Sequence, residues 1–216
     1  MNIVELFAGS RLLSDIAEKK GHNVFTIDWT NFKGIDLCID IGDLKKEDVP
    51  FIPDIVWASP DCTTYSIAAC STHRNIDKTA KSDYAKKCDS VNINWLSLLD
   101  QWLEINPNLI FFIENPRGNL RHMEFMKKYN RHTVWYCQYG DIRAKPTDIW
   151  TNSKTWKPKP MCKNYKYDHE GHIIDKHCHH ESARRGAKTG TQGLKGSYNR
   201  SKIPEQLINE ILESLE

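Results

Sequence analysis

The sequence lacks the features that mark membrane, secreted and repeat proteins. No apolar run approaches the roughly 20 residues that a transmembrane helix needs, and no apolar leader stands at the N-terminus. No internal repeat or low-complexity tract is present. We therefore expect no membrane contact and a reducing cytoplasm, where the seven cysteines serve as ligands, nucleophiles or core residues rather than as disulfides.

Net charge is also small, at +2, but it is unevenly distributed. Residues 1–152 contain 18 Lys and Arg against 20 Asp and Glu, whereas residues 153–204 contain 12 against 4, a local excess of 8 positive charges. Such an excess suits contact with phosphates, although a solvated basic loop has the same composition. With 39% hydrophobic residues in 216, the chain suits one folded domain with a modest appendage.

Apolar runs and their spacing predict a doubly wound α/β sheet. Residues 54–58 and 109–113 lack polar alternation and are rich in β-branched and aromatic side chains, as buried parallel strands are. The strand, turn and helix expected over residues 2–17 begin a βαβ unit. The other expected elements are strands at 23–27, 36–39, 133–138 and 148–151, and helices at 91–103, 119–129 and after Pro204. The expected divisions are a core at 1–152, a small irregular basic appendage at 153–202, and a C-terminal helix at 203–216 that packs back on the core.

A thiol and a carboxylate follow the two buried strands. Cys62 lies in the segment SPDCTTYS at 59–66, and Glu114 opens the segment ENPRG, 52 positions later (114 minus 62). Ligands in open α/β sheets sit outside the carboxyl ends of the strands, so we expect both side chains in one pocket. Taken singly, each has a structural alternative: an inert buried thiol and an ion-paired carboxylate.

The N-terminal strand, turn and helix suit a nucleotide-like ligand. Free backbone N–H groups at a helix start favour a carboxylate or phosphate. Asp28 lies 19 positions after Gly9 (28 minus 9), where dinucleotide-type folds place the acid that binds ribose hydroxyls. Alternatively, Gly9 only permits a turn and Asp28 only caps a helix.

Four segments together resemble the DNA cytosine-5 methyltransferase family, and most closely its short, phage-type members. They are residues 3–10, 59–66, 113–118 and 138–152, in the family's order. The resemblance implies a Rossmann-like fold that binds S-adenosylmethionine. The cofactor-binding residues that it implies are Phe7, Ala8, Gly9, Ser10, Asp28, Trp29, Asp40, Ile41 and Pro60.

The resemblance also implies a reaction, in which Cys62 adds to carbon 6 of cytosine in DNA and carbon 5 then takes the methyl group. Glu114 assists at the ring nitrogen, and Arg143 supplies a catalytic cation. Two departures stand out: Arg11 follows Gly9-Ser10 where the family has further glycines, and Asp61 replaces the usual Pro before Cys62. Methylation of RNA cytosine and a catalytically silent nucleic-acid-binding relative remain alternative interpretations.

DNA is the expected partner, bound by a monomer with the target base flipped out of the duplex. The polar stretch at 71–87 stands where the family's catalytic loop closes over DNA, although a solvated charged segment is the alternative. A phage-encoded protein in a bacterial cytoplasm, with a role in restriction-modification, fits the resemblance. The residues expected to contact nucleic acid are Ser66, Arg74, Lys78, Lys81, Lys145, Arg184, Arg185 and Lys188.

Cysteine and histidine concentrate in the basic appendage. Two cysteines and five histidines fall between positions 162 and 180, which provides enough donors for one tetrahedral zinc site. The first ligands we expect are Cys162, Cys178 and His179. The spacing fits no standard finger, and a polar loop that faces nucleic acid is the alternative.

Overall fold

The computed structural model describes residues 1–170, 172–176, 178–180 and 197–216. By their contacts these residues form two units, which are described separately below. Unit 1 comprises Met1–His132 and Asp148–Lys154, and unit 2 comprises Thr133–Thr147 and Thr155–Glu216. No helix in the described ranges has the length and apolar character that a membrane crossing requires.

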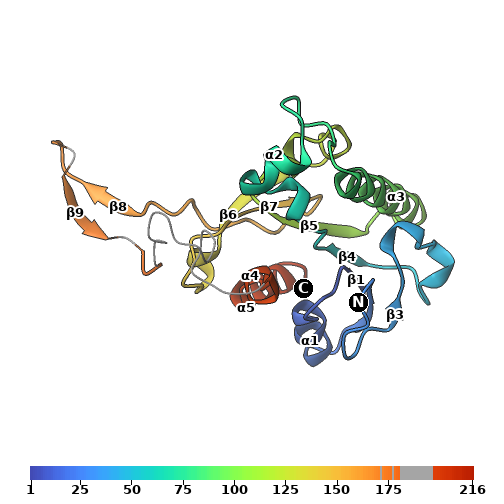
Figure 1. The fold of residues 1–216 in the computed structure, drawn as a ribbon. Coiled ribbons are helices and arrows are strands. Elements are labelled where there is room, and N and C mark those ends of the chain that lie inside the picture. The colour runs from blue at the N-terminus through green and yellow to red at the C-terminus, as the bar shows by residue number, and fades with distance from the viewer. Residues whose placement is uncertain (171, 177, 181–196) are drawn as a thin grey trace. The chain divides into compact units, whose positions relative to one another are not determined.

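The elements alternate between strands and helices in the first half of the chain (Figure 1). The strands are β1 (Asn2–Leu6), β2 (Asn23–Asp28), β3 (Leu37–Cys38), β4 (Ile55–Ala58), β5 (Ile110–Pro116), β6 (Arg131–Trp135), β7 (Pro146–Thr151), β8 (Tyr165–Tyr167) and β9 (Ile173–Lys176). The α-helices are α1 (Leu12–Lys19), α2 (Cys70–His73), α3 (Asp83–Ile105), α4 (Ser197–Ser201) and α5 (Glu205–Glu213). Short 3₁₀ helices are η1 (Ile41–Asp43), η2 (Lys46–Asp48), η3 (Thr63–Tyr65), η4 (Ile67–Ala69), η5 (Asn119–His122), η6 (Glu124–Met126) and η7 (Tyr136–Tyr139).

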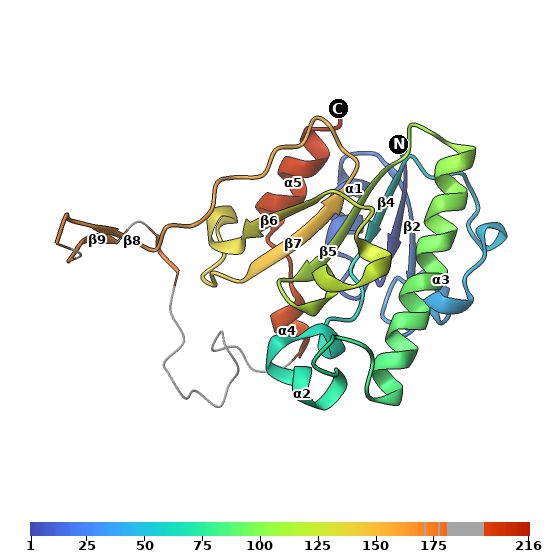
Figure 2. The ribbon, with the colours of Figure 1, turned by 90° about the horizontal axis from the view of Figure 1, so that it is seen from above.

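The main sheet has the strand order β3-β2-β1-β4-β5-β7-β6, and the pairs β3-β2, β2-β1, β1-β4 and β4-β5 are parallel. The chain winds outward in both directions from β1 and β4. Because crossovers between parallel strands are right-handed, α1 and α3 lie on opposite faces of this sheet (Figures 1 and 2). The predicted doubly wound, Rossmann-like α/β fold is confirmed.

The core of unit 1 follows from the two-residue period of its strands. Val4, Val56 and Phe111 point to one face, where they join the apolar side of α3 in one buried cluster. On the other face, the rings of Trp57 and Phe112 stack at 6.0 Å. Since β4 is buried on both faces, apolar residues run through it without alternation. β1 is similarly buried, and inside it only Glu5 interrupts the apolar residues.

Two elements of unit 1 differ from the sequence expectation. The helix expected from residue 91 begins at Asp83, because the side chain of Ser82 accepts a hydrogen bond from the Ala85 N–H and caps it. The helix expected at 119–129 is instead η5 followed by η6. Met123 separates these two turns with an extended backbone and a buried side chain.

Unit 2 contains a ribbon and the C-terminal helix. β8 and β9 pair as an antiparallel ribbon within a stretch that the sequence predicts as loops. The strand expected at 133–138 is shorter than predicted at its carboxyl end, because β6 ends at Trp135 and η7 follows. The predicted final helix is confirmed as α5, which begins directly after Pro204 and buries Leu207, Ile208, Ile211 and Leu212.

Candidate active site

A pocket of about 260 Å³ lies at the carboxyl ends of β1, β2 and β4, all in unit 1. This is the position where the strand order reverses, which is the usual ligand site of open α/β sheets. Five of the nine residues expected to bind the cofactor line it: Phe7, Asp28, Trp29, Asp40 and Ile41. Other residues line it without having been predicted: Ser59, Asp61, Tyr84, Lys87, Cys88, Val91 and Asn92.

Asp28 is fixed at the end of β2 by backbone donors. Its Oδ2 accepts from the Gly9 N–H at 3.0 Å, and its Oδ1 accepts from the Thr30 N–H at 2.8 Å. Gly9 has φ of +50°, a conformation that glycine adopts without the penalty of a Cβ. The buried carboxylate therefore joins the turn after β1 to the loop after β2, and its remaining lone pairs are available to ligand hydroxyls.

An aromatic side chain and a second carboxylate complete the lining. Trp29 is 69% exposed, so its ring offers a flat apolar surface at the pocket. Asp40 caps η1 through the Gly42 N–H and pairs with Lys87 Nζ at 2.9 Å. The hydrogen bond from Lys87 is the main cause of a lowered pKa at Asp40, which keeps this carboxyl group ionised.

The remaining predicted cofactor residues do not line the pocket. The N–H of Ala8 donates to the Ile27 carbonyl at 3.2 Å, which makes it part of the sheet's end. Ser10 is exposed, and Pro60 is buried, with its carbonyl bound to Asn115.

The departure at Arg11 has a structural explanation. Its guanidinium donates to the Gly34 carbonyl and to Glu18, so the side chain links α1 to the loop after β2. The turn also buries Glu5, whose carboxylate accepts hydrogen bonds from the backbone and hydroxyl of Ser14. Burial raises the pKa of Glu5 from 4.5 to about 7.

The segments that carry Cys62 and Glu114 interlock. In the parallel pairing of β4 with β5, Ala58 lies opposite Ile113. Glu114, two residues before the end of β5, therefore lies beside the start of the Cys62 segment. Asn115 Nδ2 donates to the Pro60 carbonyl at 2.8 Å. A Cβ added to Gly118 would lie only 2.5 Å from the Tyr65 carbonyl oxygen. The two segments are therefore in contact on both sides of Cys62, through a side-chain hydrogen bond at Pro60 and a close backbone approach at Tyr65.

Cys62 itself is half-buried and directly precedes η3, while Glu114 is 5% exposed. The neighbouring Asp61, where the family has Pro, is engaged on both oxygens. Its Oδ1 accepts from the Thr63 N–H at 2.7 Å, and its Oδ2 accepts from the Tyr84 hydroxyl. These donors partly neutralise the carboxylate, which limits its opposition to a thiolate at Cys62.

Arg74 has a different place from the one predicted. It is 3% exposed, and its guanidinium binds both oxygens of Asp89 on α3 at 2.7 and 2.8 Å. It also donates to the carbonyl and hydroxyl of Thr64 and lies 4.4 Å above the Tyr65 ring. A guanidinium buried in this way is not presented to DNA; it fixes η3, and with it the Cys62 segment, to α3.

The other residues expected to bind nucleic acid in unit 1 lie at or near the surface. Lys81 is exposed, and its Nζ donates to the Ser71 carbonyl at 3.0 Å. Lys78 is half-buried with φ of 73°. Ser66 is half-buried between η3 and η4. Their role in binding nucleic acid stays a prediction.

In unit 2, Arg143 and Lys145 are both 5% exposed. Arg143 pairs with Asp141 and donates to three backbone carbonyls at 199, 200 and 202. Lys145 Nζ lies 4.5 Å from the centre of the Tyr136 ring. Their predicted catalytic and DNA-binding roles stay predictions. The predicted DNA contacts Arg184, Arg185 and Lys188 lie outside the described residues.

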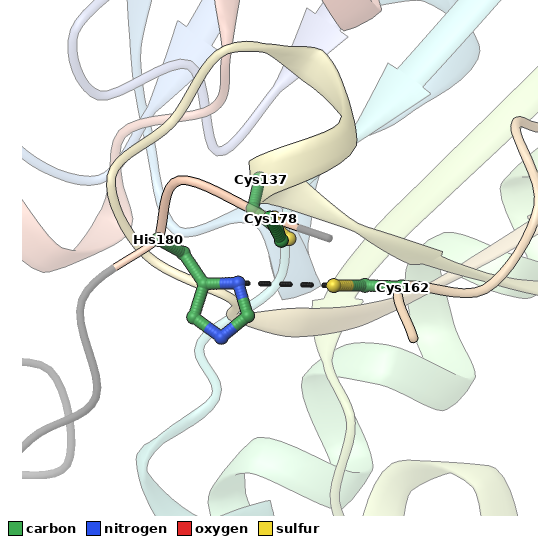
Figure 3. A group of neighbouring side chains, drawn as sticks. All are labelled: Cys137, Cys162, Cys178 and His180. Carbon is green, nitrogen blue, oxygen red and sulfur yellow. Dashed lines mark hydrogen bonds between the residues drawn. The ribbon is translucent and has the colours of Figure 1, made fainter. Parts of the chain in front are cut away.

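The expected metal ligands Cys162 and Cys178 come together, and two further residues join them. These are Cys137 and His180, and all four ligand atoms lie within 4.8 Å of one another (Figure 3). His179 is not in this group, because its Nε2 is bonded to the Asp141 carbonyl at 2.9 Å. No local sequence signal points to Cys137, which lies 25 positions before Cys162.

No family model matches the chain. It is, however, 28% identical to a probable DNA (cytosine-5)-methyltransferase of Frog virus 3 (isolate Goorha), over 231 aligned positions that cover 99% of both chains. The resemblance predicted from the motifs is thereby confirmed as a similarity along the full length of the chain. The name of this relative specifies neither a phage nor a bacterial cell, so the phage and bacterial setting stays a prediction.

Two solved structures show partial similarity. The Dnmt2 methyltransferase of S. pombe has a TM-score of 0.49 and 14% identity over 74% of this chain. A DNMT2 mutant of Spodoptera frugiperda has a TM-score of 0.47 and 18% identity over 73% of this chain. The chain spans about half the length of these two proteins, 51% and 53% respectively.

Proposed function

We propose that this protein transfers a methyl group from S-adenosylmethionine to carbon 5 of cytosine in DNA. The observation that carries the proposal is the interlocking of the Cys62 and Glu114 segments at adjacent strand ends. The same strand ends border the pocket that is lined by Asp28 and Trp29. A nucleophile, an acid and a nucleotide-like site therefore share one edge of the sheet.

The pocket residues suit the cofactor. Asp28 would bind the ribose hydroxyls, Trp29 would stack on the adenine ring, and Asp40 would accept from the adenine amino group. Lys87 occupies one oxygen of Asp40 and leaves the lone pairs needed for this contact. When bound, S-adenosylmethionine supplies an electrophilic methyl group on a sulfonium.

Cys62 would then act as the nucleophile. Carbon 5 of cytosine is unreactive while the ring keeps its conjugation, and addition of a thiolate to carbon 6 removes that conjugation. The electron pair shifts toward the ring nitrogen, where Glu114 donates a hydrogen bond or a proton. After methylation, loss of the carbon 5 proton expels the thiolate and restores the ring.

Support for DNA as the substrate comes from the full-length viral relative, whose name specifies DNA. The excess of 8 positive charges in residues 153–204 also suits a polyanion. A cytosine paired inside a duplex cannot reach the Cys62 segment, so the target nucleotide must leave the stack.

The proposal is tested by methyl transfer from labelled S-adenosylmethionine to matched DNA and RNA of the same mixed sequence. We expect 5-methylcytosine in DNA, no product with Cys62→Ala, and a rate of methyl transfer that is about 10²- to 10⁴-fold lower with Glu114→Gln. Cys70→Ser, which removes a half-buried thiol elsewhere, is the matched control and should retain activity. Product only in RNA, or full activity of Cys62→Ala, would contradict the proposal.

A further inference from the structure

A cluster of three thiols and one imidazole lies within unit 2, separate from the residues proposed for methyl transfer. Cys137, Cys162, Cys178 and His180 place one ligand atom each within 4.8 Å of all the others. Figure 3 shows the sulfur of Cys162 and the ring of His180 facing one another, with Sγ 3.7 Å from Nδ1. We propose that these four residues bind one zinc ion as a closed, structural site.

The spacing of the ligand atoms fits a tetrahedral ion. With Zn–S bonds of about 2.3 Å and Zn–N bonds of about 2.0–2.1 Å, tetrahedral geometry places sulfur and nitrogen about 3.6 Å apart and two sulfurs about 3.8 Å apart. The observed 3.7 Å between Cys162 and His180 matches the first distance. The upper limit of 4.8 Å for the other pairs exceeds the second by about 1 Å, a gap that side-chain rotation closes.

The donor set selects the metal. Thiolates are soft ligands, and three of them with one imidazole form a Cys₃His set that is typical of structural Zn²⁺. Calcium and magnesium require oxygen donors. Because four protein ligands fill a tetrahedral shell, the ion would keep no open position for a substrate.

Burial supports the same conclusion. Cys137, Cys178 and His180 are exposed by only 3, 8 and 3%. A histidine buried against three thiols gains little as a packing residue, since its ring nitrogens must be paired away from water. A bound cation would satisfy the imidazole and all three sulfurs together.

The positions of the ligands explain what the ion would do. Cys162 precedes β8, whereas Cys178 and His180 follow β9, so the ion would close the base of the ribbon. Cys137 lies in η7, directly before the segment that carries Arg143. An isolated two-stranded ribbon is marginal in water, and zinc would give it a fixed base on η7.

The first test is the metal content of the purified, full-length protein, measured by inductively coupled plasma mass spectrometry. We expect one zinc per chain. Exchange for Co²⁺ should then give the visible absorption of a tetrahedral site together with a thiolate charge-transfer band. Both readouts are independent of methyl transfer, so failure of this proposal and failure of the proposed function are distinguishable.

Neighbouring residues provide matched controls. His180→Ala and Cys137→Ser should each lower zinc retention in dialysis against a chelator by at least about tenfold, since loss of one ligand opens the shell. His179→Ala and Cys70→Ser should retain zinc as the wild type does. Circular dichroism of each variant separates loss of the metal from general unfolding.

Three results would overturn the proposal. The first is a folded wild-type protein without zinc that does not take up Co²⁺. The second is a disulfide between any two of the three cysteines in protein purified under reducing conditions. The third is retention of zinc by the His180→Ala variant together with its loss from the His179→Ala variant.

Discussion

Gly118 offers a sharp test of how the Glu114 segment supports Cys62. A methyl group in a Gly118→Ala variant would lie 2.5 Å from the Tyr65 carbonyl oxygen. The backbone would have to separate by 0.5 Å to reach 3.0 Å, the shortest distance that real contacts show, and by 0.9 Å to reach an ordinary 3.4 Å. The φ of Gly118 is −161°, so the cost is steric and not conformational.

Both stability and chemistry should respond to that displacement. Overpacking costs about 1–3 kcal/mol of unfolding free energy. A shift of about 1 Å in a reacting group costs about 100-fold in rate, so we expect covalent addition to slow by about 10- to 100-fold. The assay is the single-turnover rate of adduct formation with 5-fluorocytosine DNA, corrected for the folded fraction.

Gly21→Ala separates these two effects. Gly21 has φ of +82° and no atom within 4 Å of an added Cβ, so alanine there costs about 1–2 kcal/mol of stability through the left-handed backbone alone. It lies far in sequence from the Cys62 segment and should leave adduct formation unchanged. Equal adduct rates in the Gly118→Ala and Gly21→Ala variants would refute the positioning role of Gly118.

Three further predictions concern other parts of unit 1. The pKa of Glu5 is raised to about 7 in the folded protein, so its stabilising effect is full below pH 4.5 and is lost as the pH rises to 7. Urea denaturation should show a fall of about 3 kcal/mol in the unfolding free energy over this range, and Glu5→Gln should abolish the fall. The same dependence of stability on pH in the Glu5→Gln variant would contradict the prediction. Arg74→Met leaves Asp89 without its cationic partner and should cost about 3 kcal/mol of unfolding free energy, of which Asp89→Asn in the same chain restores a part. Strict additivity of the two changes in thermal unfolding would count against the pair. Trp29→Ala should lower the affinity for S-adenosylmethionine about tenfold in calorimetric titration. The free energy of unfolding should change by no more than about 0.5 kcal/mol, because the ring is 69% exposed. An unchanged affinity would remove Trp29 from the site.

The sequence is sufficient to predict the central strands of the sheet and the edge at which the pocket lies. Buried parallel strands are continuous apolar runs, so β4 and β5 can be predicted from the sequence. Their carboxyl ends must lie at one edge of the sheet, which predicts from the sequence alone that Cys62 lies near Glu114. The place of Asp28 at this edge can similarly be predicted from its separation of 19 positions from Gly9 in the sequence.

Features that depend on contacts between residues far apart in the sequence cannot be predicted from local patterns. Arg74 is one of several cations in a polar stretch, and only its contact with Asp89, 15 positions away, reveals that it is buried. The first turns of α3 lack an apolar period, so the sequence predicts a loop where the pocket residue Lys87 lies in a helix. Cys137 has no neighbouring cysteine or histidine in sequence, and only the fold brings it to Cys162.

The most direct test of the central claim is mass spectrometry of the intact protein after incubation with S-adenosylmethionine and a duplex that contains 5-fluorocytosine. Fluorine at carbon 5 cannot leave as a proton does, so the covalent intermediate is trapped. The account predicts an adduct that carries the methyl group, maps to the Cys62 peptide and is absent from Cys62→Ala. DNA that binds without any adduct, or an adduct that survives in Cys62→Ala, would contradict it.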